Sequence, residues 1–323
     1  MATGTVIEQM IIIFILILIG VYLNKKNIIT EDTSRNLSKL IINVSNPALM
    51  LYSSLSGEER LSNSELITGF IMFILMYAVL IFLAYTLPPL MGIKKEDRYS
   101  YKMMTIFGNV GFIGIPLTLA VLGEKALIYV SICNLLFSLI IYTFGMTIMS
   151  DAAQSQHPEK ANTNNNNSKK FKLPGWINIG TVTAIITIVL YISNITLPNI
   201  IMTTCSYIGR STTFLSMLVL GVSVATMVPK NVFGNIKLYI FCIIRLIIVP
   251  VIMIRLFNIF TSDSLLINTI TIMISISFGN MPLMFAKNFE LKEDDISGGI
   301  ILSTVLSVVT IPIVSLLVSN LFS

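Results

Sequence analysis

The chain reads FGNVGFIGIP at residues 107–116 and FGNMP at residues 278–282. Each stretch places Asn, Gly and Pro in the middle of a long apolar run, and the two begin 171 residues apart in a chain of 323. Proline lacks a backbone N–H donor and clashes with the carbonyl group four residues before it, so it kinks or ends an α-helix. The two stretches therefore predict one interrupted helix in each half of the chain.

The composition indicates that lipid surrounds most of the protein. Hydrophobic residues make up 54% of the chain and charged residues 11%, and the mean hydropathy is +0.85, whereas soluble domains carry about 25% charged residues. Lipid offers the backbone no hydrogen-bond partners, and the apolar runs are solid rather than alternating, which favours helices over a β-barrel. The sequence predicts an all-α polytopic membrane protein.

A membrane-spanning helix needs about 20 mainly apolar residues, and the chain has ten such runs. They cover residues 6–23, 37–55, 65–87, 101–122, 126–149, 176–193, 206–228, 236–257, 264–286 and 296–321. A polar segment rich in Asn and Lys, residues 151–175, is predicted to be a disordered linker. It separates two five-helix repeats, residues 1–150 and 176–323. Because five is odd, the second repeat enters the membrane inverted.

The basic residues predict the orientation. Sixteen of the 21 Lys and Arg residues fall on the linker's side of the predicted spans and four on the opposite side. Cytoplasmic loops of membrane proteins carry the excess of Lys and Arg. We therefore predict a multi-pass protein of the cell membrane with both termini outside and a cytoplasmic linker. The net charge of +5 has this origin, so nucleic acid is not an expected partner.

Paired breaks in corresponding helices of two halves indicate the substrate site of a transporter. The half-helix ends direct their dipoles at such a site, and an Asn amide can both donate and accept hydrogen bonds, which suits a carboxylate. The alternative is a pair of kinked packing helices, since Gly and Pro are frequent in membrane helices. The candidate substrate-binding residues in the breaks are Asn109, Gly111, Gly114, Pro116, Asn280, Met281 and Pro282.

Other polar residues within the apolar runs are further candidates. Asn46 precedes a proline in the second span, Asn134 lies in the fifth, and Ser303 and Thr304 lie in the tenth. Each has the alternative role of a hydrogen bond between helices. Arg245, in the eighth span, can attract an organic anion. It can also extend toward water or cap the carbonyl end of a half-helix.

Several kinds of chemistry have no support in the sequence. There is no GxxxxGK[ST] or HExxH motif, no Asp or Glu at the centre of a predicted span, and no Cys/His grouping. These absences argue against an ATPase, a buried carboxylate relay, a prenyltransferase and a metal site. The sequence predicts neither an enzyme nor a cofactor.

The chain resembles the auxin efflux carrier family over essentially its whole length. The resemblance rests on Asn109 followed by Gly-Ile-Pro at residues 114–116, on Phe-Ala-Lys at residues 285–287, and on residues 295–312. It implies a scaffold of spans 1, 2, 6 and 7, often dimeric, and a transport domain of spans 3–5 and 8–10. It also implies that the broken fourth and ninth helices cross at their prolines in the middle of the membrane, beside Asn109 and Asn280.

The resemblance further implies an elevator-type secondary carrier of small organic anions, such as auxin-like or dicarboxylic acids. The second break departs from plant members, which have a Gln-Gly-containing version, and no membrane carboxylate supports sodium coupling of the kind seen in the related bile-acid symporter fold. Two alternatives are an anion channel and a non-transporting membrane receptor.

Overall fold

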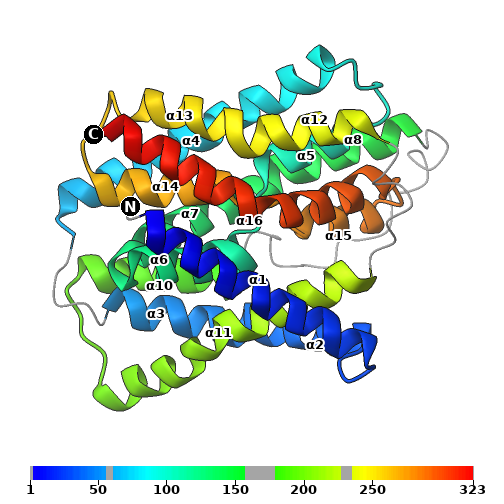
Figure 1. The fold of residues 1–323 in the computed structure, drawn as a ribbon. Helices are drawn as coiled ribbons and strands as arrows, with labels where there is room; N and C mark the ends of the chain where they lie inside the picture. Colours follow the sequence, from blue (N-terminus) through cyan, green and yellow to red (C-terminus); the bar gives the residue numbers. More distant parts are fainter. Residues whose placement is uncertain (1–2, 56–60, 157–178, 227–234, 323) are drawn as a thin grey trace, which may run out of the picture.

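The computed structural model describes residues 3–55, 61–156, 179–226 and 235–322 (Figure 1). They form helices without a named strand, so the prediction of an all-helical protein is confirmed for this part of the chain. The helices are α1 (Thr3–Lys25), α2 (Glu31–Leu40), α3 (Asn46–Leu55), α4 (Asn63–Leu90), α5 (Arg98–Ile106), α6 (Ile115–Leu122), α7 (Leu127–Ile140), α8 (Met146–Gln156), α10 (Ile179–Ile192), α11 (Asn199–Thr226), α12 (Ile236–Ile243), α13 (Val249–Phe257), α14 (Ser264–Ser275), α15 (Met281–Asn288) and α16 (Asp294–Phe322).

Short π-helical turns join several of these helices end to end. They are η1 (Ile41–Ser45), η2 (Val110–Gly114), η4 (Ile141–Gly145) and η6 (Ile244–Ile248), and the 3-10 turn η3 (Glu124–Ala126) precedes α7. Within the described residues, six helical stretches are long and apolar enough to cross a membrane, and three shorter apolar helices accompany them. These features are those of a polytopic membrane protein.

The helix ends differ from the prediction near the linker. Helix α8 continues to Gln156, so the first residues of the predicted linker, 151–156, extend the preceding helix. The rest of that prediction, residues 157–175, lies outside the described residues. A change from apolar to polar residues marks where a helix leaves the membrane, but the helix can continue into water beyond that point. At the end of α8 the side chain of Gln156 donates to the carbonyl of Glu96 at 3.0 Å.

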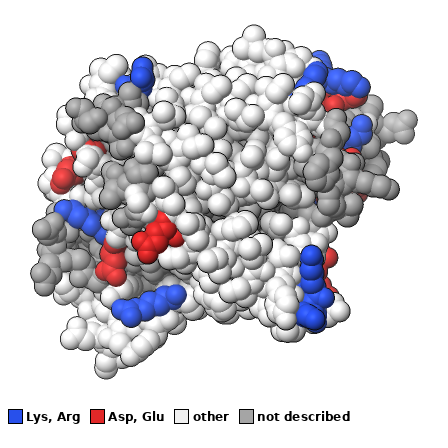
Figure 2. Space-filling view, viewed as in Figure 1, with Lys and Arg blue, Asp and Glu red and all other residues white. Residues whose placement is uncertain are grey.

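The surface is divided into an apolar band and two charged ends. In Figure 2 the blue and red side chains gather at the left and right of the molecule and leave a wide white region between them. Both termini lie at the left end in the same view (Figure 1). Large apolar side chains that are exposed at the surface include Ile71, Phe82 and Ile252. A hydrophobic band of this kind is what lipid chains require of a protein surface.

The helices form two groups in Figure 1. Helices α1, α2, α3, α10 and α11 pack on one another in its lower part, and α4, α5 and α12–α16 lie above them. Helices α1 and α11 approach each other closely at Gly20 and Gly221. A Cβ atom added at Gly221 would lie 2.2 Å from the carbonyl oxygen of Ile17 and 2.8 Å from the Cα of Gly20. Small residues permit this close packing of membrane helices.

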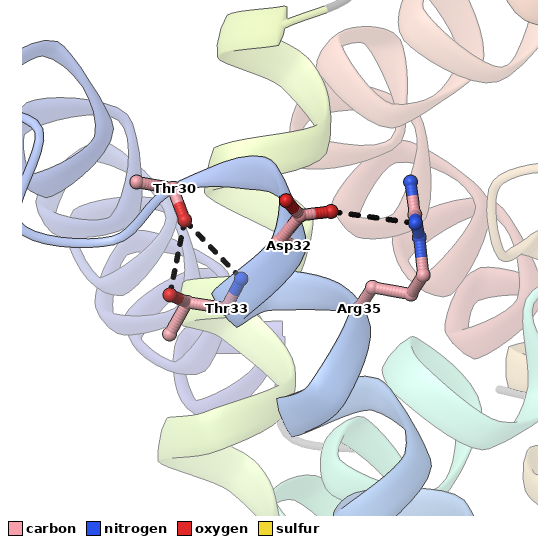
Figure 3. Close-up of polar contacts among 4 residues, drawn as sticks. All are labelled: Thr30, Asp32, Thr33 and Arg35. Atoms are coloured by element: carbon pink, nitrogen blue, oxygen red, sulfur yellow. Dashed lines mark hydrogen bonds and ion pairs between the residues drawn. The ribbon is translucent and has the colours of Figure 1, made fainter.

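Helix α2 has a well-defined first turn (Figure 3). The Thr30 hydroxyl accepts the backbone N–H of Thr33 at 3.3 Å, and Arg35 pairs with Asp32 at 3.3 Å. A Thr at this position satisfies one of the free N–H groups at a helix start, and Asp32 adds favourable negative charge there. Helix α2 is strongly amphipathic and runs through η1 into α3.

Candidate functional site

The two predicted breaks are present, and they meet. Helix α5 ends at Ile106 and α14 at Ser275, and the chain that follows each is extended. Gly108 and Phe278 form an antiparallel β-bridge. The N–H of Asn109 donates to the carbonyl of Ser277 at 2.8 Å, and the N–H of Gly279 donates to the carbonyl of Phe107 at 3.0 Å. Each break thus satisfies backbone groups of the other, as a membrane interior requires.

The prolines do not form the crossing. Pro116 lies in the first turn of α6 and Pro282 in the first turn of α15. For Pro282 this position is favourable, because its missing N–H has no partner at the start of α15 in any case, whereas Pro116 follows η2 within the continuous helical stretch 110–122. The bridge at Gly108 and Phe278 lies eight and four residues before the respective prolines. The implied crossing at the prolines is therefore corrected to a crossing at the Phe-Gly pairs that precede them.

A cavity of about 200 Å³ adjoins the crossing. It is bounded by η1 and α3, the first break and η2, α7 and η4, the start of α10, and the second break with α15. Its lining includes six of the predicted site residues: Asn46, Asn109, Gly111, Asn134, Asn280 and Met281. Sites for drug-sized ligands measure about 300–1,000 Å³, so this cavity suits a smaller molecule.

Three amides at the cavity have an atom without a protein partner. The Oδ1 of Asn109 accepts the N–H of Phe112 at 3.3 Å, and the Nδ2 of Asn46 donates to the carbonyl of Gly111 at 3.2 Å. The buried Nδ2 of Asn109, Oδ1 of Asn46 and Oδ1 of Asn280 have no hydrogen bond. Buried amide groups rarely lack a partner. Water or a ligand in the cavity can supply the missing donors and acceptors.

Arg245 lies in η6 and does not line the cavity. Its Nε donates to the carbonyl of Thr105 at 2.8 Å and its Nη1 to the carbonyl of Ile274 at 2.6 Å. These carbonyls belong to the last turns of α5 and α14, immediately before the two breaks. The arginine therefore has the geometry of the capping alternative, and it caps both half-helices at once.

The remaining predicted residues lie outside the cavity, and two of them, Gly114 and Ser303, contact the breaks or the helix beside them. Gly114, Pro116, Pro282, Ser303 and Thr304 are not among its lining residues. A Cβ atom at Gly114 would approach the Met273 side chain to 3.1 Å, so this glycine allows η2 to pack against α14. Ser303 accepts the N–H of Phe278 at 3.0 Å, and it donates to the carbonyl of Ile300 at 3.1 Å.

Ser303 and its neighbour Thr304 provide a matched pair of substitutions. Ser303→Ala leaves the buried N–H of Phe278 without an acceptor, which costs about 1–3 kcal/mol. The buried hydroxyl of Thr304 has no partner, so Thr304→Val is expected to be neutral or stabilising. Melting temperatures of the two variants in detergent measure the difference. Equal destabilisation by both substitutions would contradict the assigned role of Ser303.

Sequence reasoning missed part of the cavity wall. Ile179 and Gly180 at the start of α10, and Ser138 and Tyr142 near the end of α7, line the cavity. The two residues of α10 are apolar or small, so nothing in their pattern marks them as part of a site. Ser138 and Tyr142 are polar residues within an apolar run, and the spacing of about one helical turn between them and Asn134 is a signal that could have identified them.

A second, larger cleft lies beside the cavity. It has a volume of about 690 Å³ and is bounded by α2 and the end of α11 on one side and by α15 and the start of α16 on the other. Asn280 and Met284 belong to the linings of both spaces. The cleft contains charged residues of both signs, including Lys287, which pairs with Glu293 at 3.5 Å. Among the residues that the structure describes, no cluster of His, Cys, Asp or Glu could hold a metal ion.

Known proteins identify the family of the chain. The model of a family described as "membrane transport protein" matches residues 5–315. The chain belongs to this family. It is the auxin efflux carrier-like family that the motifs around Asn109 and residues 285–287 indicate. Its members are transporters rather than enzymes, in agreement with the sequence prediction.

An archaeal relative is similar over nearly its full length. An uncharacterised transporter of Methanocaldococcus jannaschii is 24% identical over 315 residues, which cover 94% of this chain and 96% of the relative. The matched region therefore extends over both halves of the chain. This member of the membrane transport protein family is thus a multi-pass membrane transporter.

Proposed function

We propose that this transporter is a secondary carrier of small organic anions, and that the carboxylate binds where the two breaks meet. The observation that supports this most strongly is the convergence of two helix starts on one cavity. Helix η2 with α6 begins after Asn109, and α15 begins after Asn280. The first N–H groups of a helix and its positive dipole end attract anions. The opposite, carbonyl-bearing ends of α5 and α14 are occupied by Arg245.

The unsatisfied amides assign roles to individual residues. The Nδ2 of Asn109 donates to the carboxylate of the bound anion. The free Oδ1 atoms of Asn46 and Asn280 accept from a donor elsewhere on the substrate or from water. The apolar residues around them, such as Ile42, Phe137 and Met284, accommodate an apolar body. A small, singly or doubly charged carboxylic acid satisfies all of these groups.

The helix groups support alternating access. The carrier has ten spans in two inverted repeats, with each broken pair, α5–α6 and α14–α15, counted as one span. The scaffold consists of spans 1, 2, 6 and 7, which can also form a homodimer, and spans 3–5 and 8–10 form the moving transport domain. The cleft between α2 and α15 is the route by which the cavity reaches one side of the membrane. Both termini lie outside, and the linker is cytoplasmic.

The test is an uptake assay in proteoliposomes with a panel of labelled carboxylates that includes benzoate and succinate. Asn109→Asp keeps the oxygen that accepts the N–H of Phe112, but it replaces the donor with a negative charge. We expect at least a tenfold loss of anion flux, because the added negative charge repels a carboxylate. Asn109→Ala and Asn280→Ala are expected to reduce flux as well. The proposal fails if both alanine variants transport every anion at the wild-type rate.

Two further measurements, together with the uptake assay, separate the alternatives. A carrier gives flux that saturates with substrate concentration, whereas an anion channel gives unitary conductance steps in planar membranes. A non-transporting receptor binds a carboxylate, detected as a rise in melting temperature with ligand concentration, but moves none into the vesicles.

A further inference from the structure

Arg245 is an isolated charge in the interior of the protein. Within the described residues it is the only charged side chain that is buried, with 1% of its surface exposed. It lies near the middle of the apolar helical stretch Ile236–Phe257. The ion pairs of the described residues include Arg35 with Asp32 and Lys287 with Glu293, and the partners of the Arg245 guanidinium are backbone carbonyls. An unpaired charge at membrane depth is costly and therefore indicates a function.

Partial charges stabilise Arg245 where no carboxylate does. The carbonyl end of a helix carries about half an elementary negative charge. The guanidinium group donates to two such ends, at Thr105 and at Ile274. Together they offset the cost of burying the arginine. The carbonyl ends are the negative ends of helix dipoles, and a dipole carries no net charge because its positive end balances the negative one. The net charge of this region therefore remains one positive unit.

The surroundings of Arg245 belong to one group of helices. Its two acceptors lie in α5 and α14, and η6 packs against α12, α13, α14 and α16. All of them are in the upper group of Figure 1, which the proposed function assigns to the moving body. Other charged residues of these helices are partly or fully exposed, among them Arg98 and Lys102 in α5 and Arg255 in α13. Among the charged side chains of these helices that the structure describes, Arg245 is the one that is buried.

This inference rests on the proposed carrier function. We propose that Arg245 is the voltage-sensing charge of the empty carrier: it moves through the membrane field when the unloaded transport domain changes sides. A bound monocarboxylate compensates this charge, so the membrane potential acts mainly on the return of the empty carrier. Arg245 is thus a positioning residue for the crossing and also the source of voltage dependence.

The test measures charge movement without any substrate. The purified full chain is placed in a planar membrane, and voltage steps are applied in the absence of carboxylates. The wild-type protein is expected to give a transient current that saturates with voltage, with up to one elementary charge per protein. Arg245→Lys is expected to keep this charge movement, and Arg245→Gln to lose at least half of it. Arg255→Gln, an exposed arginine in the same helical stretch, is the matched control and should leave it unchanged.

The outcomes separate this inference from the proposed function. A wild-type protein that transports a carboxylate but shows no transient charge movement overturns the role of Arg245 without any variant being needed. Arg245→Gln with wild-type charge movement and a normal melting temperature overturns it as well. If the wild-type protein moves none of the carboxylates in the flux panel, the proposed function fails. Charge movement that depends on Arg245 would then still support its displacement in the field.

Discussion

Gly279→Ala is expected to lower anion flux about a hundredfold. The added methyl group would lie 2.9 Å from the carbonyl oxygen of Gly108 and 3.3 Å from its carbonyl carbon. Both atoms are backbone atoms of the bridge between the two breaks, so neither can turn aside. The breaks must separate, and the hydrogen bond from Gly279 to Phe107 must lengthen or break. A displacement of about 1 Å in a functional site can cost on the order of a hundredfold in rate.

Gly108→Ala is the informative comparison, because it lies in the same bridge. Its methyl group would meet the Ile276 side chain at 3.0 and 3.2 Å, and a side chain can adopt another rotamer. We expect a loss of flux several times smaller than that of Gly279→Ala. Uptake of labelled carboxylate and the melting temperature are measured for both variants. If Gly279→Ala retains half of the wild-type flux, tight contact of the two breaks is not required for transport.

The sequence predicted the meeting of the breaks because the signal is local and repeated. Asn, Gly and Pro within apolar runs disrupt a helix whatever surrounds it, and two such disruptions at an offset of 171 residues imply two related helices. Asn109 and Asn280 occupy corresponding positions in the two breaks, and both line the cavity. Asn46 and Asn134 line the cavity too. A polar side chain in an apolar run has no hydrogen-bond partner in lipid, so it faces the protein interior or a polar cavity.

Other features depend on contacts that no local pattern encodes. The double cap by Arg245 requires the ends of α5 and α14 to lie side by side, 169 residues apart along the chain between Thr105 and Ile274. The position of the crossing was also beyond the sequence, since the two prolines lie eight and four residues after the bridged residues Gly108 and Phe278. The contribution of Ile179 and Gly180 to the cavity has no polar signature at all.

Gly221→Ala is expected to have the largest effect on stability. The new Cβ atom would lie 2.2 Å from the carbonyl oxygen of Ile17 and 2.8 Å from the Cα of Gly20. Both are backbone atoms of α1, so α1 and α11 can accommodate the methyl group only by moving apart. Overpacking typically costs about 1–3 kcal/mol, and we expect a value at the upper end of this range. The melting temperature in detergent measures the effect.

Gly4→Ala is the control in the partner helix. A Cβ atom at Gly4 has nothing within 4 Å, and alanine favours the helical conformation over glycine by about 1 kcal/mol. The variant should therefore be as stable as the wild type or slightly more stable. If Gly221→Ala melts at the wild-type temperature, α1 and α11 do not require the close backbone approach at Gly20 and Gly221. The contact between α1 and α11 would then be adjustable. This outcome would contradict a rigid scaffold, which the proposed movement of the transport domain requires.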